Sequence, residues 1–227
     1  METSRAVFDE VLRRINHAAV LARSGKAQEA LVAYEAVFEP LSSGESIPQP
    51  PMLRVDMTSR RSNLLEKLGR REEALALLDD LDLREAIRED PKARYELAIA
   101  RAHTLGRSDA IDEMLHAFSH ALQIVEEELG GEAKLRFEVV HGLLDSIQAT
   151  QSWQLLLDTA RQFVAYGRDR VDNLVVMEAS WHVPFGYRGL GEIDKARVHA
   201  RAILESMHRH GQEEGIKVWK EFLSTLG

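Results

Sequence analysis

An apolar stripe with helical spacing recurs along almost the whole chain. In the segment FDEVLRRINHAAVLA the apolar side chains follow the three-and-four spacing of one helix face, and LLEKLGRREEALALL and RYELAIARAHTLG show the same spacing. No segment shows the strict alternation typical of a strand, and no Asn-Gly or Asp-Gly turn joins two apolar runs. The pattern therefore predicts an all-α protein.

Four glycines open similar segments, each with a short polar turn followed by an alanine and an apolar helix face. These segments begin at Gly25, Gly69, Gly106 and Gly191. Their separations (69 − 25, 106 − 69 and 191 − 106) are 44, 37 and 85 residues, and the last leaves room for a degenerate unit near QATQSWQLLLDTARQFVAYG. Because a helix precedes each glycine, the unit is a helical hairpin, which buries its faces only by stacking on neighbours. Small residues are expected where paired helices cross, in the pairs Ala18 with Ala30, Ser62 with Ala74, and Ala98 with Ala110.

A few polar residues and prolines mark expected helix boundaries. Four of the six prolines fall in EPLSSGESIPQPPM, which predicts a proline-rich loop over residues 40–51. Asp90 before Pro91 predicts a helix N-terminus, because aspartate caps the first amides and proline suits the first helical position. Ser108 and Ser152 are expected as further N-caps.

The motif around the first of these glycines resembles a known repeat. Its G-x-x-x-E-A-L-x-x-Y, formed by Gly25, Glu29, Ala30, Leu31 and Tyr34, resembles the second half of a tetratricopeptide repeat (TPR). GRREEAL from Gly69 and, more weakly, GEIDKA from Gly191 are similar to it. The resemblance covers residues 8–40, 56–82, 92–120 and 176–207.

This resemblance implies an architecture and a function class. The expected fold is a single all-α domain over residues 1–227, a right-handed α-solenoid of about five antiparallel helical hairpins with a capping C-terminal helix at about residues 212–226. In such a solenoid the first helices line a concave groove that holds a peptide or a partner's helix. The version that clamps a C-terminal carboxylate is not expected, because only Arg60, among the aligned positions Ile15, Ala19 and Arg60, is suitable.

Aligned in this way, several residues face the expected groove. Cations interleaved with aromatic rings fit an acidic or aromatic-bearing peptide segment, while the alternative is a solvated helix face with buried rings. Ile99 is among these groove-facing positions, and the expected partner-binding residues are Arg60, Asn63, Lys67, Tyr95, His103, Trp181, His182, Phe185 and Arg188.

The stretch WHVPFGYRGLG combines a groove face with a helix breaker. Gly191 aligns with Gly25 and Gly69 as the turn inside a hairpin, so Trp181 to Leu190 should end a first helix. Pro184 then lies inside that helix, where proline removes a hydrogen bond and clashes with the preceding turn. We therefore expect the helix to kink or divide near residue 183.

Composition excludes several classes of protein. The chain has 29 basic and 37 acidic side chains, a net charge of −8, which argues against nonspecific nucleic-acid binding. The absence of cysteine excludes disulfides, thiolate metal sites and cysteine nucleophiles. No signal-peptide pattern and no apolar run of membrane-spanning length is present, so we expect a cytoplasmic protein with no membrane partner.

Histidine spacing gives two weak metal candidates. His116 and His120 lie four residues apart, a spacing that can hold a metal, but the sequence offers no third ligand; a second group comprises His199, His208 and His210. We expect neither group to bind a metal, and we expect no cofactor. No phosphate-binding glycine loop or nucleophile elbow occurs.

The sequence therefore favours a non-catalytic protein- or peptide-binding adaptor or regulatory scaffold. Two alternatives stay open: a sensor module that responds to a peptide or small molecule, and an enzyme or metal-binding protein on a helical scaffold. Homo-oligomer formation also stays open.

Overall fold

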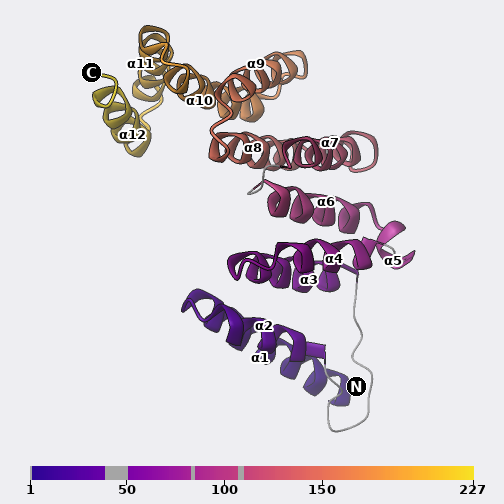
Figure 1. Ribbon diagram of the computed structural model, residues 1–227. Coiled ribbons are helices and arrows are strands. Elements are labelled where there is room, and N and C mark those ends of the chain that lie inside the picture. The colour runs from indigo at the N-terminus through magenta and orange to yellow at the C-terminus, as the bar shows by residue number, and fades with distance from the viewer. Residues whose placement is uncertain (1, 39–50, 83–84, 107–109) are drawn as a thin grey trace. The chain divides into compact units, whose positions relative to one another are not determined.

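The computed structural model describes residues 2–38, 51–82, 85–106 and 110–227, and every regular element in these ranges is helical (Figure 1). The all-α prediction is therefore confirmed. None of the described helices is both long enough and apolar enough to cross a membrane. The helices are α1 (Glu2–Arg23), α2 (Ala27–Glu35), α3 (Pro51–Lys67), α4 (Arg71–Asp82), α5 (Glu85–Arg88), α6 (Pro91–Leu105), α7 (Ile111–Glu127), α8 (Ala133–Ala149), α9 (Trp153–Asp169), α10 (Asn173–Gly189), α11 (Ile193–Arg209) and α12 (Glu213–Ser224), and a 3-10 turn (Ala36–Phe38) follows α2.

The predicted boundaries are met in part. Asp90 caps α6 as expected, because its Oδ1 accepts from the amides of Lys92 (2.9 Å) and Ala93 (3.2 Å). Ser152 occupies the N-cap position of α9, but its side chain makes no capping bond there. Pro51 is the first residue of α3 and not the end of a loop, since the missing amide of proline costs nothing in a first turn. Ser108 lies outside the described residues. Residues 40–50 of the expected proline-rich loop lie outside them as well.

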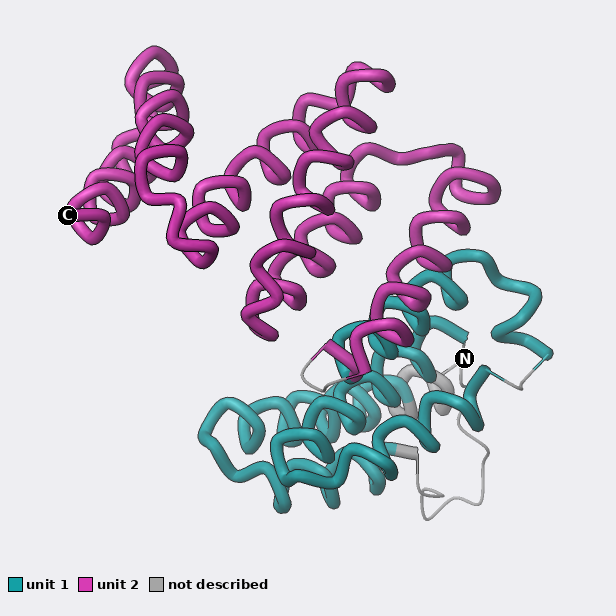
Figure 2. Tube along the Cα trace, turned by 45° about the horizontal axis from the view of Figure 1, so that its top comes forward, with its two compact units in different colours: residues 1–104 teal, residues 105–227 magenta. Residues whose placement is uncertain are grey.

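The chain forms two compact units, residues 1–104 and residues 105–227 (Figure 2). The single domain expected over residues 1–227 stays a prediction. The capping helix expected at about 212–226 corresponds to α12, Glu213–Ser224.

Small residues permit close helix pairing in unit 1. In the hairpins α1–α2 and α3–α4, Ala18, Ala30, Ser62 and Ala74 are at most 1 % exposed, as the spacing predicts. The buried Ser62 hydroxyl lies 3.0 Å from that of Thr104, which itself donates to the carbonyl of Ala100. Ser62 therefore donates to Thr104, and this bond joins α3 to α6.

Unit 2 has a regular period of 20 residues. Its helices α8 to α12 begin at positions 133, 153, 173, 193 and 213. Each is preceded by a residue with positive φ, at Gly131, Gln151, Val171, Gly191 and Gly211. At the last three of these turns the following amide bonds back across the helix end: Asp172 N to Gly167 O (2.8 Å), Glu192 N to Tyr187 O (2.9 Å) and Gln212 N to Met207 O (3.1 Å). The turn predicted at Gly191 is therefore confirmed.

Two turns without glycine explain why the fourth hairpin is hard to recognise in the sequence. The hairpin α8–α9 is fully formed, but Gln151 holds the turn position between its two helices, and Val171 holds the next one (φ 58° and 57°). An alignment based on glycine cannot find turns that contain no glycine.

Helix α10 runs unbroken from Asn173 to Gly189 with Pro184 inside it, so the division expected near residue 183 as an alternative to a kink is wrong, and the kink stays a prediction. The helix is held against α9 at very close range. A Cβ atom added at Gly186 would lie 3.0 Å from Leu157 Cβ and 3.2 Å from Leu157 Cα, and one at Gly189 would overlap the ring of Trp153. This packing offsets the cost of an interior proline, about 3 kcal/mol.

A buried charge network ties four helices of unit 2 together. The Arg136 guanidinium of α8 donates to Glu126 Oε1 of α7 (2.6 Å) and to Asp172 Oδ2 (3.1 Å). Asp172 caps α10 by accepting from Val175 N (3.2 Å), and the hydroxyl of Tyr166 on α9 donates to Glu126 (2.6 Å). Burial and the Glu126 carboxylate raise the pKa of Tyr166 to about 12, which keeps this donor protonated.

Replacing Val171 by glycine should stabilise the protein. Val171 is 82 % exposed and loses little packing, whereas a left-handed φ costs an L-residue about 1–2 kcal/mol. After allowing for the greater freedom of glycine in the unfolded chain, we expect a gain of about 1 kcal/mol in the free energy of unfolding, measured by urea denaturation. The matched control is Val198→Gly, at a 66 % exposed helical position of α11, which should lose about 0.5 kcal/mol. A loss of stability in both variants would contradict the strain at Val171.

Replacing Gly186 by alanine should destabilise unit 2, although alanine is the better helix former. The new Cβ meets the backbone of α9, so the two helices must separate, at a cost of about 1–2 kcal/mol by thermal or urea unfolding. Gly215→Ala in α12 is the control, since its Cβ would meet only the flexible Met207 side chain, and we expect it to be neutral or stabilising. Equal effects of the two substitutions would show that α9 and α10 are not closely packed.

Candidate functional site

The groove residues predicted in unit 1 lie in two different environments, one exposed and one partly or fully buried. Arg60, Asn63 and Lys67 are exposed on one face of α3, where Arg60 pairs with Asp56 (2.9 Å). On α6, Tyr95 is a core residue, 1 % exposed, and Ile99 is half-buried, whereas His103 is exposed. The buried ring of Tyr95 is therefore not available on a binding surface.

The residues predicted on α10 point to three different neighbours. Phe185 packs on α12, with ring centroids 4.8 Å from Phe222 and 5.8 Å from Trp219, and the Arg188 guanidinium lies 5.6 Å from the Phe222 ring. The side chain of His182 is buried and reaches Gln148 on α8. Only Trp181 among them lines a groove. The predicted face is divided because α8, α9, α11 and α12 all contact this one helix.

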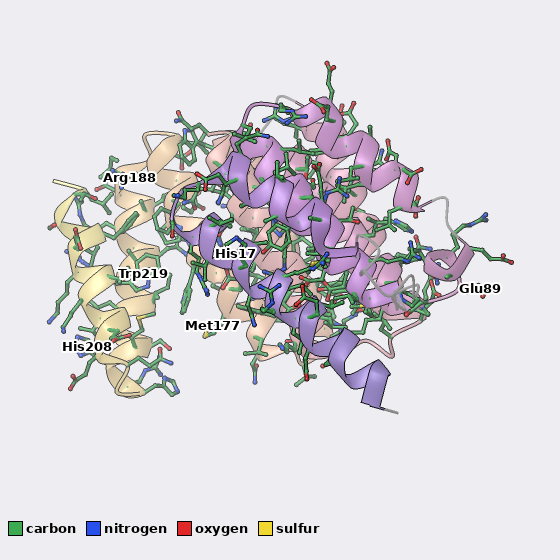
Figure 3. The ribbon with its side chains drawn as sticks, turned by 90° about the horizontal axis from the view of Figure 1, so that it is seen from below. His17, Glu89, Met177, Arg188, His208 and Trp219 are labelled. Carbon is green, nitrogen blue, oxygen red and sulfur yellow. The ribbon has the colours of Figure 1, made fainter. Side chains whose placement is uncertain are left out.

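This groove lies in unit 2, between α9, α10 and α11, and has a volume of about 840 Å³. Met177, labelled in Figure 3, lines it together with Trp181 and with apolar side chains of all three helices. Arg161 and Arg168 of α9 line it as well, and none of its lining residues, all within the described range 110–227, carries a carboxylate.

The cationic character of the groove comes from its two arginines. Arg161 donates to the Tyr187 hydroxyl and lies over the Tyr187 ring, 5.2 Å from its centroid. His199 stacks on the same ring at 5.3 Å. Burial, reinforced by the nearby charge of Arg161, lowers the pKa of His199, so this histidine adds no charge at neutral pH. The groove is thus locally positive on a chain whose net charge is −8.

A second cluster of polar side chains joins α8 to α10, and sequence reasoning missed three of its four members. His141 Nδ1 lies 2.8 Å and His182 Nε2 lies 3.2 Å from the same oxygen, Glu178 Oε1. Asp145 completes the cluster, with oxygens 3.5 Å from His141 Nε2 and 3.8 Å from His182 Nε2. The available signal was the four-residue spacing inside both HGLLD and EASWH.

The acid–base properties of this cluster follow from its two carboxylates. Burial alone would lower the pKa of His141, but the hydrogen bond that its ring donates to Glu178 and the charges of Asp145 and Glu178 raise it overall. Burial would raise the pKa of Glu178, yet its hydrogen bonds to His182 and His141 lower it overall. The lowered pKa of Glu178 favours its ionised carboxylate, and the raised pKa of His141 favours the protonated imidazole beside it.

The histidines that the sequence analysis considered do not form such a group. His116 and His120 are exposed on α7, and His208 and His210 are exposed at the end of α11. Within the described residues, the group whose donor atoms gather closely enough for a metal ion is His141, Asp145 and His182.

Comparison with known proteins identifies the fold. No family model and no curated protein sequence matches the chain. Among solved structures, the chain is similar to the Signal Transduction ATPase with Numerous Domains protein with a tetratricopeptide repeat sensor from Pyrococcus horikoshii, with a TM-score of 0.66 at 12 % identity over 98 % of this chain. This chain spans about a third (34 %) of that protein.

Two further structures are kinesin light chain TPR-like repeats from Podosopora anserina. Their TM-scores are 0.61 and 0.57, each at 17 % identity, over 93 % and 92 % of this chain and 99 % and 94 % of theirs. At these identities the likeness shows the fold alone: the chain has the TPR-like fold of stacked helical hairpins, as its glycine-centred segments indicate.

Proposed function

We propose that the protein is a non-catalytic binding module that holds an acidic, apolar-faced peptide segment of a partner protein in the groove between α9, α10 and α11. The observation that carries this proposal is the combination of Trp181 with Arg161 and Arg168 in a groove without carboxylates. Solenoids of helical repeats present extended surfaces of this kind to their partners.

Size and lining both suit a peptide. A volume of about 840 Å³ lies within the range of sites that bury a ligand largely, about 300–1,000 Å³. Trp181 is half-buried and still accessible, and a tryptophan in such a position is a typical anchor of an interface. Met177 and Met207 are flexible side chains that adapt to the shape of an inserted apolar residue.

The positive charge of the groove favours a partner segment of negative charge. Since the chain as a whole carries −8, an acidic peptide is repelled by most of the protein and attracted by this groove. Such complementarity fixes the place and orientation of binding more than its strength.

The polar side chains of the groove support binding without chemistry. A nucleophilic serine needs a base within hydrogen-bond reach. The Ser180 hydroxyl instead donates to the Val176 carbonyl (2.6 Å), a bond typical of serine inside a helix.

The test uses designed helical peptides with leucine along one face and either glutamate or lysine on the other. Fluorescence anisotropy should show that the full chain binds the glutamate peptide and not the lysine peptide. Trp181→Ala combined with Arg168→Ala should weaken binding at least about 30-fold, because truncation of an anchor of this kind costs about 2 kcal/mol or more.

The matched control is Arg60→Ala combined with Lys67→Ala, which removes two cations from the exposed face of α3 and should leave the affinity unchanged. Circular dichroism should show the same helical content in all variants. Equal affinity of the two double variants for the glutamate peptide would contradict the groove as the binding site, and a loss confined to the control would move the site to α3.

A second function of the same groove is to sense a small molecule. It is favoured by the likeness to a structure whose repeat region is called a sensor. Native mass spectrometry of the purified chain should then show a bound small molecule, which the Trp181→Ala variant loses.

A further inference from the structure

We propose that His141, Asp145 and His182 form a binding site for a divalent transition-metal ion of the zinc type, which fastens α8 to α10. This site is separate from the groove between α9, α10 and α11, and the two have no lining residue in common. The inference rests on geometry, charge and the way in which the rings are held.

The donor atoms are already gathered. One ligand atom from each of the three residues lies within 4.8 Å of the others. Zinc bonds of about 2.0–2.1 Å at tetrahedral angles place ligand atoms about 3.4 Å apart. Asp145 Oδ2 lies 3.5 Å from His141 Nε2 and Asp145 Oδ1 lies 3.8 Å from His182 Nε2, so each oxygen of the one carboxylate is near this distance from one of the two rings. Small side-chain rotations therefore complete the set.

The charge of the cluster calls for a cation. Among the described residues, the cationic side chains that come within 4.0 Å of Asp145 or Glu178 are His141 and His182. A histidine ligates a metal only as the neutral imidazole, and with both imidazoles neutral the two carboxylates leave a charge of about −2, one of them on Glu178, which is only 3 % exposed. A divalent ion balances this charge, whereas an unbalanced buried carboxylate is costly.

The rings are oriented by neighbours that are not ligands. His182 Nδ1 contacts Gln148 Oε1 at 3.2 Å, which directs Nε2 toward the cluster, and His182 is only 6 % exposed. His141 stacks on Phe137 with an angle of 4° between the rings, and its Nδ1 bonds to Glu178. A carboxylate or amide that holds the far nitrogen of a ligating histidine is the usual support of a metal site. Glu178 and Gln148 are thus positioning residues.

The ligand types select the metal. Two imidazoles and one carboxylate suit zinc and its neighbours among the divalent transition metals better than calcium or magnesium, which prefer oxygen ligands. Three protein ligands leave one position open to water or to a ligand from outside.

The test is a titration of the tag-free full chain, first stripped with a chelator, with ZnCl₂ in an isothermal calorimeter. We expect one zinc ion per chain. His141→Ala and Asp145→Asn should each weaken binding by about 100-fold, since even outer residues of metal sites contribute 10- to 100-fold. Both side chains are half or more exposed, so both variants should fold, which circular dichroism checks.

The matched control is His116→Ala combined with His120→Ala, which removes a pair of the same spacing from α7 and should leave zinc binding unchanged. Zinc should also raise the melting temperature of the wild type and of this control, but not of His141→Ala. The proposal is overturned if the wild type binds no stoichiometric zinc, or if His141→Ala and Asp145→Asn bind it as tightly as the wild type.

Discussion

Residues with a left-handed backbone, spaced 20 positions apart, set the arrangement of α8 to α12 in unit 2. From Gly131 to Gly211 these residues end one helix and let the next begin two residues later. Equal helix lengths follow, so α8 and α10 lie side by side, while α9 and α11 flank α10. The cluster of His141, Asp145 and His182 lies between α8 and α10, and the groove lies between α9, α10 and α11. Both candidate sites are thus products of one repeated turn.

The residues of α10 suit a helix that is in close contact with neighbours on several sides. Gly186 and Gly189 permit the approach of α9, and Phe185 fills the contact with α12. A helix held in this way tolerates Pro184, because the surrounding packing fixes the backbone where a hydrogen bond is missing. In WHVPFGYRGLG, the proline and the first two glycines thus belong to a closely packed helix, and the third glycine, Gly191, forms the turn that follows it.

The local features could be predicted from the sequence, and the relations between helices could not. Apolar spacing and capping chemistry predicted the helices, the Asp90 cap and the Gly191 turn, since each depends on neighbouring residues alone. The α8–α9 hairpin escaped the glycine alignment because Gln151 accepts the strained turn. The residues predicted to line one groove lie on different surfaces, and Tyr95 is buried. The reason is that the neighbour a helical residue faces comes from a part of the chain distant in sequence.

The two proposed sites meet on consecutive residues of α10. Successive side chains of an α-helix point about 100° apart, so Trp181 faces the groove while His182 faces α8. An ion bound at the proposed site would restrict the rotation of α10 about its own axis, and the same restriction would fix Trp181 at the wall of the groove. A peptide that requires this position of Trp181 would then gain affinity from the ion, and by linkage the ion would gain the same factor from the peptide. Since both sites share one rigid helix, this coupling needs no change of fold.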